Sequence, residues 1–220
     1  AEPLVKTIGM RSYQLWPKWL SELEAPVFYQ NEGTLVVAHQ GDKAEMERFD
    51  RRAKHVLADS DYVQLDKAAL SLREPELAER FDQAMWFEKE SCIDNRQLYQ
   101  QLTSFLELHA NWVITDEIGE LNSTEIEKLT QRYLQCSAES FDVVLDCRGN
   151  GGKANLAELR SVRGEVIRVS APEVNFKHAI RLMHPRYPFY LAPRPNNEYV
   201  LGATVIESDD RSQLTVRSGL

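Results

Sequence analysis

Four short strand patterns follow one another in the last third of the chain, and they constrain the fold more than any other feature. Apolar and β-branched residues dominate the segments 162–169, 179–183, 189–193 and 199–206, with only short stretches between them. Strands at such short intervals are joined by turns rather than by crossover helices, which favours antiparallel pairing. The sequence therefore predicts an antiparallel sheet in this part of the chain.

The first 110 residues mix helical and strand patterns. The spacing of apolar residues and the capping signals predict helices over residues 10–23, 42–54, 65–72 and 94–109. Short β-rich runs predict strands over residues 27–29, 34–38 and 84–93, with a hairpin turn at residues 31–33. Helices and strands are thus expected to alternate before the antiparallel region begins.

The middle of the chain carries two further strand patterns, one on each side of a charged and polar stretch at residues 121–130. Residues 112–115 form the first, and residues 141–147 (FDVVLDC) form the second. The second is a dense apolar run, which is typical of a buried parallel strand. Together with the absence of internal repeats, this order predicts an α+β fold with a mixed, largely antiparallel sheet and flanking helices.

Composition excludes several classes of protein. A hydrophobic content of 43% and a charged content of 27% are those of a soluble globular protein. The formal net charge of −8 argues against a nucleic-acid partner, which needs a clustered basic surface. No apolar run approaches the ~20 residues that span a bilayer. The chain is therefore expected to act without a membrane or a nucleic acid.

The cysteines and histidines give no sign of a disulfide framework or a metal site. Cys92, Cys136 and Cys147 are odd in number and far apart, which indicates free thiols in the reducing cytoplasm, although a buried cysteine also serves simply as a small hydrophobe. The five histidines have no metal-ligand spacing to one another or to the cysteines. We expect a cytoplasmic protein with no bound metal.

The segment 149–154 (GNGGKA) follows the apolar run 141–147 and matches the pattern G-x-G-x-x-A. A dinucleotide fingerprint needs a helix that begins within the glycines, so that its N-terminus meets the pyrophosphate. Only about ten residues separate Gly152 from the next strand at Val162, which is too few for a crossover helix. Two interpretations stay open, a glycine-rich strand end that approaches a cofactor and a simple surface turn.

In their order and spacing, the segments 161–167 (SVRGEVI), 187–194 (YPFYLAPR) and 200–204 (VLGAT) resemble the substrate-domain strands of FAD-dependent amine oxidases of the D-amino acid oxidase family, and most of all the glycine oxidases of thiamine biosynthesis. The segments 15–20 (LWPKWL) and 33–38 (GTLVVA) extend the resemblance over nearly the whole chain. It implies FAD as the cofactor, a small amino acid or amine as the substrate, and hydride transfer to the flavin.

The resemblance also implies a domain organisation. Residues 1–89 and 153–220 would be the two parts of the substrate domain, and residues 90–152 a partial FAD-binding α/β module. Such enzymes need a dinucleotide fingerprint before these strands and an arginine loop after them, and this sequence contains neither. We therefore expect a fragment that is inactive alone, with a non-catalytic binding or interaction domain as the alternative. The oligomeric state stays open, and a homo-oligomer is one option.

Several positions match cofactor-contacting residues of the family. A glycine after the strand at 141–147 would lie against the FAD, a helix and strand before it would return into the FAD domain, and a turn in the segment 161–167 would approach the flavin edge. The cofactor-binding residues implied in this way are Ile118, Cys147, Arg148, Gly149, Arg163 and Gly164.

Two residues of the segment 187–194 are candidates for the substrate site. Tyr190 matches the tyrosine that lines the substrate pocket of glycine oxidases, where a phenol supplies an apolar wall and a polar hydroxyl, and we take it as the catalytic candidate. The alternative is a cross-strand aromatic in a sheet. Arg194 could bind a substrate carboxylate through its guanidinium. The alternative there is a structural arginine after Pro193.

Overall fold

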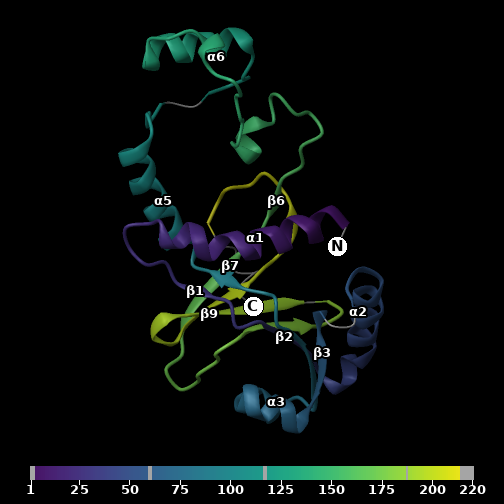
Figure 1. Ribbon diagram of the computed structural model, residues 1–220. Helices are drawn as coiled ribbons and strands as arrows, with labels where there is room; N and C mark the ends of the chain where they lie inside the picture. Colours follow the sequence, from purple (N-terminus) through teal and green to yellow (C-terminus); the bar gives the residue numbers. More distant parts are fainter. Residues whose placement is uncertain (1–2, 59–60, 116–117, 187, 214–220) are drawn as a thin grey trace. The chain divides into compact units, whose positions relative to one another are not determined.

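The structure, a computed structural model, describes residues 3–58, 61–115, 118–186 and 188–213, and it contains two compact units (Figure 1). Unit 1 holds the described residues up to Leu102, residues 164–204 and Gln213. Unit 2 holds the described residues of 103–163 and residues 205–212. The boundary between them on the N-terminal side falls inside the helix α5, Asn95–His109.

Unit 1 carries most of the regular structure. Its helices are α1 Pro3–Ser21, α2 Lys43–Val56, α3 Lys67–Arg73, α4 Pro75–Ala78 and the first half of α5. Its strands are β1 Tyr29–Gln30, β2 Thr34–Ala38, β3 Val63–Asp66, β4 Gln83–Phe87, β5 Cys92–Ile93, β7 Val166–Ser170, β8 Ala179–Met183, β9 Phe189–Arg194 and β10 Glu198–Gly202.

Seven of these strands form one sheet in the order β3-β4-β2-β8-β9-β10-β7. The pair β2–β8 is parallel and the other neighbours are antiparallel, so the predicted mixed, largely antiparallel sheet with flanking helices is confirmed. The short loops after β8 and β9 allow the C-terminal strands to pair as a meander, as their spacing predicted. Strands β1 and β5 form a separate two-stranded sheet.

Alternation along the strands gives the sheet two different faces. Leu35 and Val37 of β2 belong to a buried cluster that includes residues of α3 and α4, whereas Val36 belongs to a cluster with α2. The first cluster extends to Ile180 of β8 and packs against Leu191 of β9. Helix α2 packs on the second face over β2 and β4, through residues such as Met46, and this cluster reaches Met183 at the end of β8. The remaining strands are therefore available for a surface hollow on that face.

Three of the elements predicted in unit 1 differ in the structure. The helix expected over 65–72 begins at Lys67, because the Asp66 carboxylate caps it by accepting a hydrogen bond from the Ala69 N–H at 2.8 Å. The strand expected over 84–93 is two strands, β4 and β5, with a turn between them. The hairpin expected around residues 31–33 is wrong, since β1 pairs with β5 and β2 pairs with β4 and β8.

Unit 2 has less regular structure. It contains α6 Ser123–Leu129, the π-helical turn η3 Thr130–Leu134, the 3-10 turns η4 Ala138–Ser140 and η5 Gly149–Gly152, and the paired strands β6 Val162–Arg163 and β11 Ile206–Glu207. The strands predicted over 112–115 and 141–147 are wrong: both segments lack strand structure, and Ile114 and Leu145 are about four-fifths exposed. Among the described residues no strand pairs with either segment, so neither has the backbone partners that a strand requires.

The two units divide the chain at 102/103, 163/164, 204/205 and 212/213, whereas the sequence suggested boundaries at 89/90 and 152/153. The assignment of these stretches to a substrate domain and an FAD module stays a prediction. None of the described helices is both long and apolar enough to cross a membrane.

Candidate functional site

A hollow of about 660 Å³ lies on the half of the unit 1 sheet that α2 leaves uncovered. Five strands of the sheet, the short strand β5 and the first residues of α5 supply its lining. Tyr190 and Arg194, the two substrate-site candidates, both belong to this lining.

Tyr190 faces the hollow rather than the core. Tyr190 and Leu191 are consecutive in β9 and therefore point to opposite faces of the sheet. Leu191 packs against the buried cluster that contains Leu35 and Val37, so Tyr190 points to the face with the hollow. The residue remains 39% exposed, so its ring is not sealed in the core. Arg181 of β8 and Gly202 of β10 are its register partners on the neighbouring strands. The alternation along β9 therefore presents the phenol to the open side of the sheet.

Gly202 makes room for that phenol. A Cβ placed on Gly202 would lie 2.9 Å from the Tyr190 hydroxyl oxygen and 2.6 Å from Cγ1 of Val166. Atoms do not approach a real Cβ so closely, so a side chain at position 202 would displace the tyrosine or the valine. Gly202 was not among the predicted site residues, although a glycine inside a strand is a sign that another group approaches the backbone closely.

Arg194 is buried and its guanidinium is held by the chain itself. Its Nη1 donates to the Pro193 carbonyl at 2.8 Å and its Nη2 to the Ile93 carbonyl at 3.2 Å. Its Nε lies 3.3 Å from the Asp94 carboxylate, which makes an ion pair rather than an aligned hydrogen bond. Only 7% of the side chain is exposed. These contacts tie β5 to the sheet and favour the interpretation of Arg194 as a structural arginine.

Asp94 connects this arginine to the start of α5. One carboxylate oxygen caps the helix by accepting from the N–H groups of Arg96 at 2.9 Å and Gln97 at 3.2 Å. The other lies 3.0 Å from Arg168 Nη2. Burial opposes ionisation of this carboxyl, but the two N–H groups together with Arg168 and Arg194 outweigh it and hold the pKa of Asp94 below its usual value. Asp94 is therefore a fixed anion behind the wall of the hollow.

The hollow itself is rich in positive charge. Arg96, Arg168, Arg181 and Arg194 line it, and Glu90 is its one acidic lining residue. This contrasts with the net charge of −8 for the whole chain. A concave surface lined by one sign of charge raises the local concentration of ligands of the opposite sign. The hollow is suited to a small anionic or zwitterionic molecule.

The residues predicted to bind the cofactor lie mostly in unit 2, where Arg148 forms a clamp. Its guanidinium donates to both Asp146 oxygens, at 2.8 and 2.7 Å, and to the Asn155 side-chain oxygen at 3.0 Å. It also donates to the carbonyls of Ile118 and Gly119, each at 2.8 Å. These contacts use all five N–H donors of an arginine. The guanidinium beside Asp146 lowers the pKa of that carboxyl to about 2.

Gly149 follows this clamp and begins η5, a 3-10 turn rather than an α-helix. Its φ is +55°, a conformation that favours glycine, and no atom of the chain lies within 4 Å of the place where a Cβ would be. Cys147, two residues earlier, is an exposed free thiol. Because no α-helix begins in the glycines, the segment 149–154 lacks the geometry of a dinucleotide fingerprint.

Arg163 and Gly164 were predicted to approach the flavin edge. Arg163, in unit 2, donates to the Asp210 carbonyl and to the Ser212 hydroxyl, each at 3.1 Å. Gly164, in unit 1, would place a Cβ 3.5 Å from the Thr204 carbonyl, which is an ordinary contact distance. The chain alone therefore leaves room for a side chain at position 164. The cofactor roles of both residues stay predictions.

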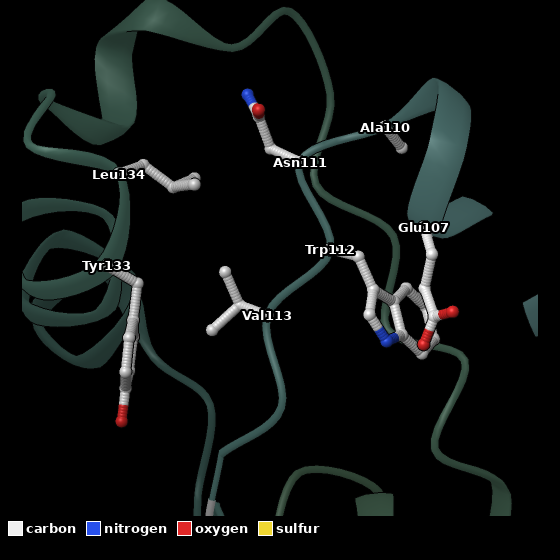
Figure 2. A pocket seen from close by; sticks show the side chains of 7 residues that line it. All are labelled: Glu107, Ala110, Asn111, Trp112, Val113, Tyr133 and Leu134. Atoms are coloured by element: carbon white, nitrogen blue, oxygen red, sulfur yellow. The ribbon is translucent and has the colours of Figure 1, made fainter. Parts of the chain in front are cut away.

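Unit 2 also has a hollow of its own, of about 470 Å³ (Figure 2). Trp112 and Val113 line it after the end of α5, and Tyr133 and Leu134 line it from η3. Figure 2 shows Val113 between the side chains of Tyr133 and Trp112. None of the predicted site residues lines this hollow. It offers apolar contact, but its lining brings no acid–base pair together.

The sequence matches the family described as FAD dependent oxidoreductase (DAO) over residues 2–218. The chain belongs to this family of FAD-dependent oxidoreductases. A thiamine biosynthesis oxidoreductase, ThiO, of Rhizobium etli is 36% identical to it over 218 residues, which are 99% of this chain and 58% of that protein. The chain thus spans somewhat more than half the length of this relative.

Solved structures share the fold at low sequence identity. Glycine oxidase from Geobacillus kaustophilus has a TM-score of 0.72 at 18% identity, over 100% of this chain and 60% of that one. Iminodiacetate oxidase from Chelativorans sp. BNC1 has a TM-score of 0.61 at 17% identity, over 95% of this chain and 59% of that one.

The family uses FAD, but the residues described here do not fit the phosphate part of that cofactor. A pyrophosphate needs backbone N–H groups at a helix N-terminus, and the glycines of unit 2 lead into a 3-10 turn instead. The nearest guanidinium, that of Arg148, already donates all its hydrogen bonds to the chain. By itself the described part of the chain is thus no complete FAD site.

Proposed function

We propose that this chain serves an oxidase of small amino acids or amines, glycine-like in size, in which hydride passes from the substrate to the flavin. The hollow of unit 1 would hold the substrate, with Tyr190 as one wall. The observation that carries the proposal is the Tyr190 phenol on the uncovered face of the sheet, in a hollow lined by four arginines. The match with the family and with ThiO of Rhizobium etli supports the reaction class.

The charge of the hollow supports an amino acid rather than a neutral amine as the substrate. A carboxylate gains from nearby guanidinium groups, and the tyrosine hydroxyl can orient either a carboxylate or an amine. The described residues around the hollow contain no histidine and no free carboxylate aimed at Tyr190 that would act as a general base. The chain's own contribution would be to bind and orient the substrate.

The proposal can be tested on the chain itself, by NMR titration with glycine of protein labelled in its tyrosine rings. We expect glycine to shift the Tyr190 resonance, identified by its loss in Tyr190→Phe. That variant lacks the reporting signal, so its glycine binding is measured by calorimetry, and it should be weakened roughly two- to tenfold, which corresponds to one net hydrogen bond of about 0.5–1.5 kcal/mol. If saturating glycine leaves the Tyr190 signal unmoved, the substrate hollow is wrongly placed.

A non-catalytic binding domain is the second candidate, because the described residues do not form a phosphate site for FAD. The two candidates differ in what glycine does to added FAD when oxygen is absent. In an oxidase, glycine passes a hydride to the flavin and the visible flavin absorbance bleaches. A binding domain binds glycine at Tyr190 and leaves the flavin absorbance unchanged.

A further inference from the structure

Tyr190, Gly202 and Val166 lie side by side on three neighbouring strands of the unit 1 sheet. Gly202 of β10 is the register partner of Tyr190 on β9 and of Val166 on β7. Directly opposite residues project to the same face of a sheet. Tyr190 and Val166 both line the hollow of unit 1. The three residues therefore form one row across the floor of the hollow, with the glycine in the middle.

The phenol of Tyr190 leans over the glycine toward the valine. A Cβ on Gly202 would lie 2.9 Å from the Tyr190 hydroxyl oxygen and 2.6 Å from Val166 Cγ1. These two distances to one point place the hydroxyl oxygen and Val166 Cγ1 at most about 5.5 Å apart. Adjacent strands are separated by about 4.7–4.9 Å, so a ring that leans over β10 brings its hydroxyl close to β7. A ligand at the Tyr190 hydroxyl therefore lies beside Val166 as well.

The space between the hydroxyl and the valine methyl is too narrow for a further carbon atom. Non-bonded heavy atoms settle at separations of about 3.5–4.0 Å, so a carbon on the line between two others needs about 7 Å. The hydroxyl oxygen and Val166 Cγ1 are at most about 5.5 Å apart. A carbon that a ligand directs toward β7 must therefore rise off the floor of the hollow, whereas a hydrogen atom in that place requires no such shift.

The side chain of Val166 is suited to act as a wall. It is 46% exposed, so its methyl groups face the hollow rather than fill the core. A β-branched side chain has few rotamers and does not swing aside easily. Its strand, β7, is paired with β10 from Ser170 to Val166, which holds the backbone of the valine in place.

We infer that Val166 is a specificity-determining residue, which limits the substituent that a ligand can carry on the β7 side of the Tyr190 hydroxyl. The inference rests on the proposed function of the hollow and adds the residue that selects glycine over larger amino acids by size. Gly202 contributes indirectly, because the phenol leans toward Val166 only while position 202 has no Cβ. A valine that only supported the phenol would affect small and large ligands alike.

The test titrates the tyrosine-labelled chain with glycine and with three ligands that each add one methyl group, namely N-methylglycine, D-alanine and L-alanine. We expect wild type to bind at least one methylated ligand about tenfold or more weakly than glycine, the usual discrimination against one extra methylene. Val166→Ala should reduce this ratio at least about fivefold and leave the dissociation constant for glycine within about twofold of wild type. Val166→Thr keeps the β-branched shape and should keep the ratio, and Val166→Ile should widen it.

Val63→Ala is the matched control, since Val63 is exposed to a similar degree on β3 of the same sheet and does not line the hollow. It should leave all four dissociation constants within about twofold of wild type. If wild type binds all four ligands alike, or if Val166→Ala changes all four by the same factor, the inference is wrong and the proposed function stands. If glycine does not shift the Tyr190 signal even in wild type, the proposed function itself fails.

Discussion

Glu74 should be the most costly single carboxylate to remove from this chain. Its side chain is buried, with 1% exposed, and its Oε1 accepts three hydrogen bonds from the loop before β8. The donors are the Lys177 N–H at 2.7 Å, the His178 N–H at 3.0 Å and His178 Nδ1 at 2.7 Å. Strand β8, which carries Arg181, begins at the next residue. Glu74 therefore fixes one end of the strand that lines the hollow.

The expected loss in the free energy of unfolding follows from the groups that Glu74→Ala leaves without a hydrogen-bond acceptor. Two backbone N–H groups and one ring nitrogen lose their acceptor, and an unsatisfied buried polar group costs about 1–3 kcal/mol. Some water will reach the new space, so we expect a loss of about 3–5 kcal/mol, as for other broken buried pairs. That is a large part of the roughly 5–15 kcal/mol that stabilises a typical domain. Glu74→Gln keeps an oxygen acceptor and should cost clearly less.

Urea unfolding followed by tryptophan fluorescence measures the effect, because the Trp86 ring packs edge-on against His178 at a centroid distance of 5.0 Å. Glu76→Ala is the matched control. Glu76 is only partly buried and holds the same loop through one hydrogen bond, which it accepts from the Asn175 N–H at 2.8 Å. Its loss should cost about 0.5–1.5 kcal/mol. Equal effects of Glu74→Ala and Glu76→Ala would refute the argument from burial.

Three further outcomes are expected. Gly202→Ala should destabilise unit 1 by about 1–3 kcal/mol and shift the Tyr190 ring signal in NMR, because the new Cβ collides with the phenol; an unchanged signal would contradict the contact. Arg148 lowers the pKa of Asp146 to about 2, from the ordinary value of 3.8. The clamp therefore contributes stability that is fully present above pH 3.8 and is lost as the pH falls toward 2. An NMR titration of the Asp146 carboxyl with its midpoint at the ordinary value would show that the clamp is absent. The purified chain should not retain FAD, and flavin absorbance at about one equivalent would disprove this.

The sequence predicted the sheet of unit 1 better than its turns. The strand patterns of β8, β9 and β10 are strong signals, and in the structure the alternation along β9 turns Tyr190 and Leu191 to opposite sides of the sheet. The prediction of a hairpin at residues 31–33 was wrong because β1 pairs with β5 and not with β2. This pairing depends on contacts between segments that are far apart in the sequence. Local sequence does not contain that information.

In the candidate site, too, the sequence showed some residues, and the roles of others depended on contacts between distant segments. Tyr190 became a candidate through the resemblance to glycine oxidases, whereas the role of Arg194 depended on contacts with Asp94 and with the backbone carbonyl of the distant Ile93. Val166 and Gly202 were missed as site residues because their importance comes from their place across the sheet from Tyr190. Neighbours across a sheet become visible only when the register is known.

The two failed strands of unit 2 follow from a related cause. A dense apolar run such as residues 141–147 indicates side chains that are stable only when buried. Such a run usually forms a parallel strand when other strands flank it on both sides. Among the described residues no strand pairs with this run, and Val143 is 68% and Leu145 79% exposed. Its backbone therefore forms no hydrogen bonds with a neighbouring strand. The hydrogen bonds of the nearby Arg148 to the carbonyls of Ile118 and Gly119 hold this part of unit 2 instead. An apolar pattern indicates that a segment is stabilised by burial. Strand formation also requires a neighbouring strand with which the segment can form hydrogen bonds.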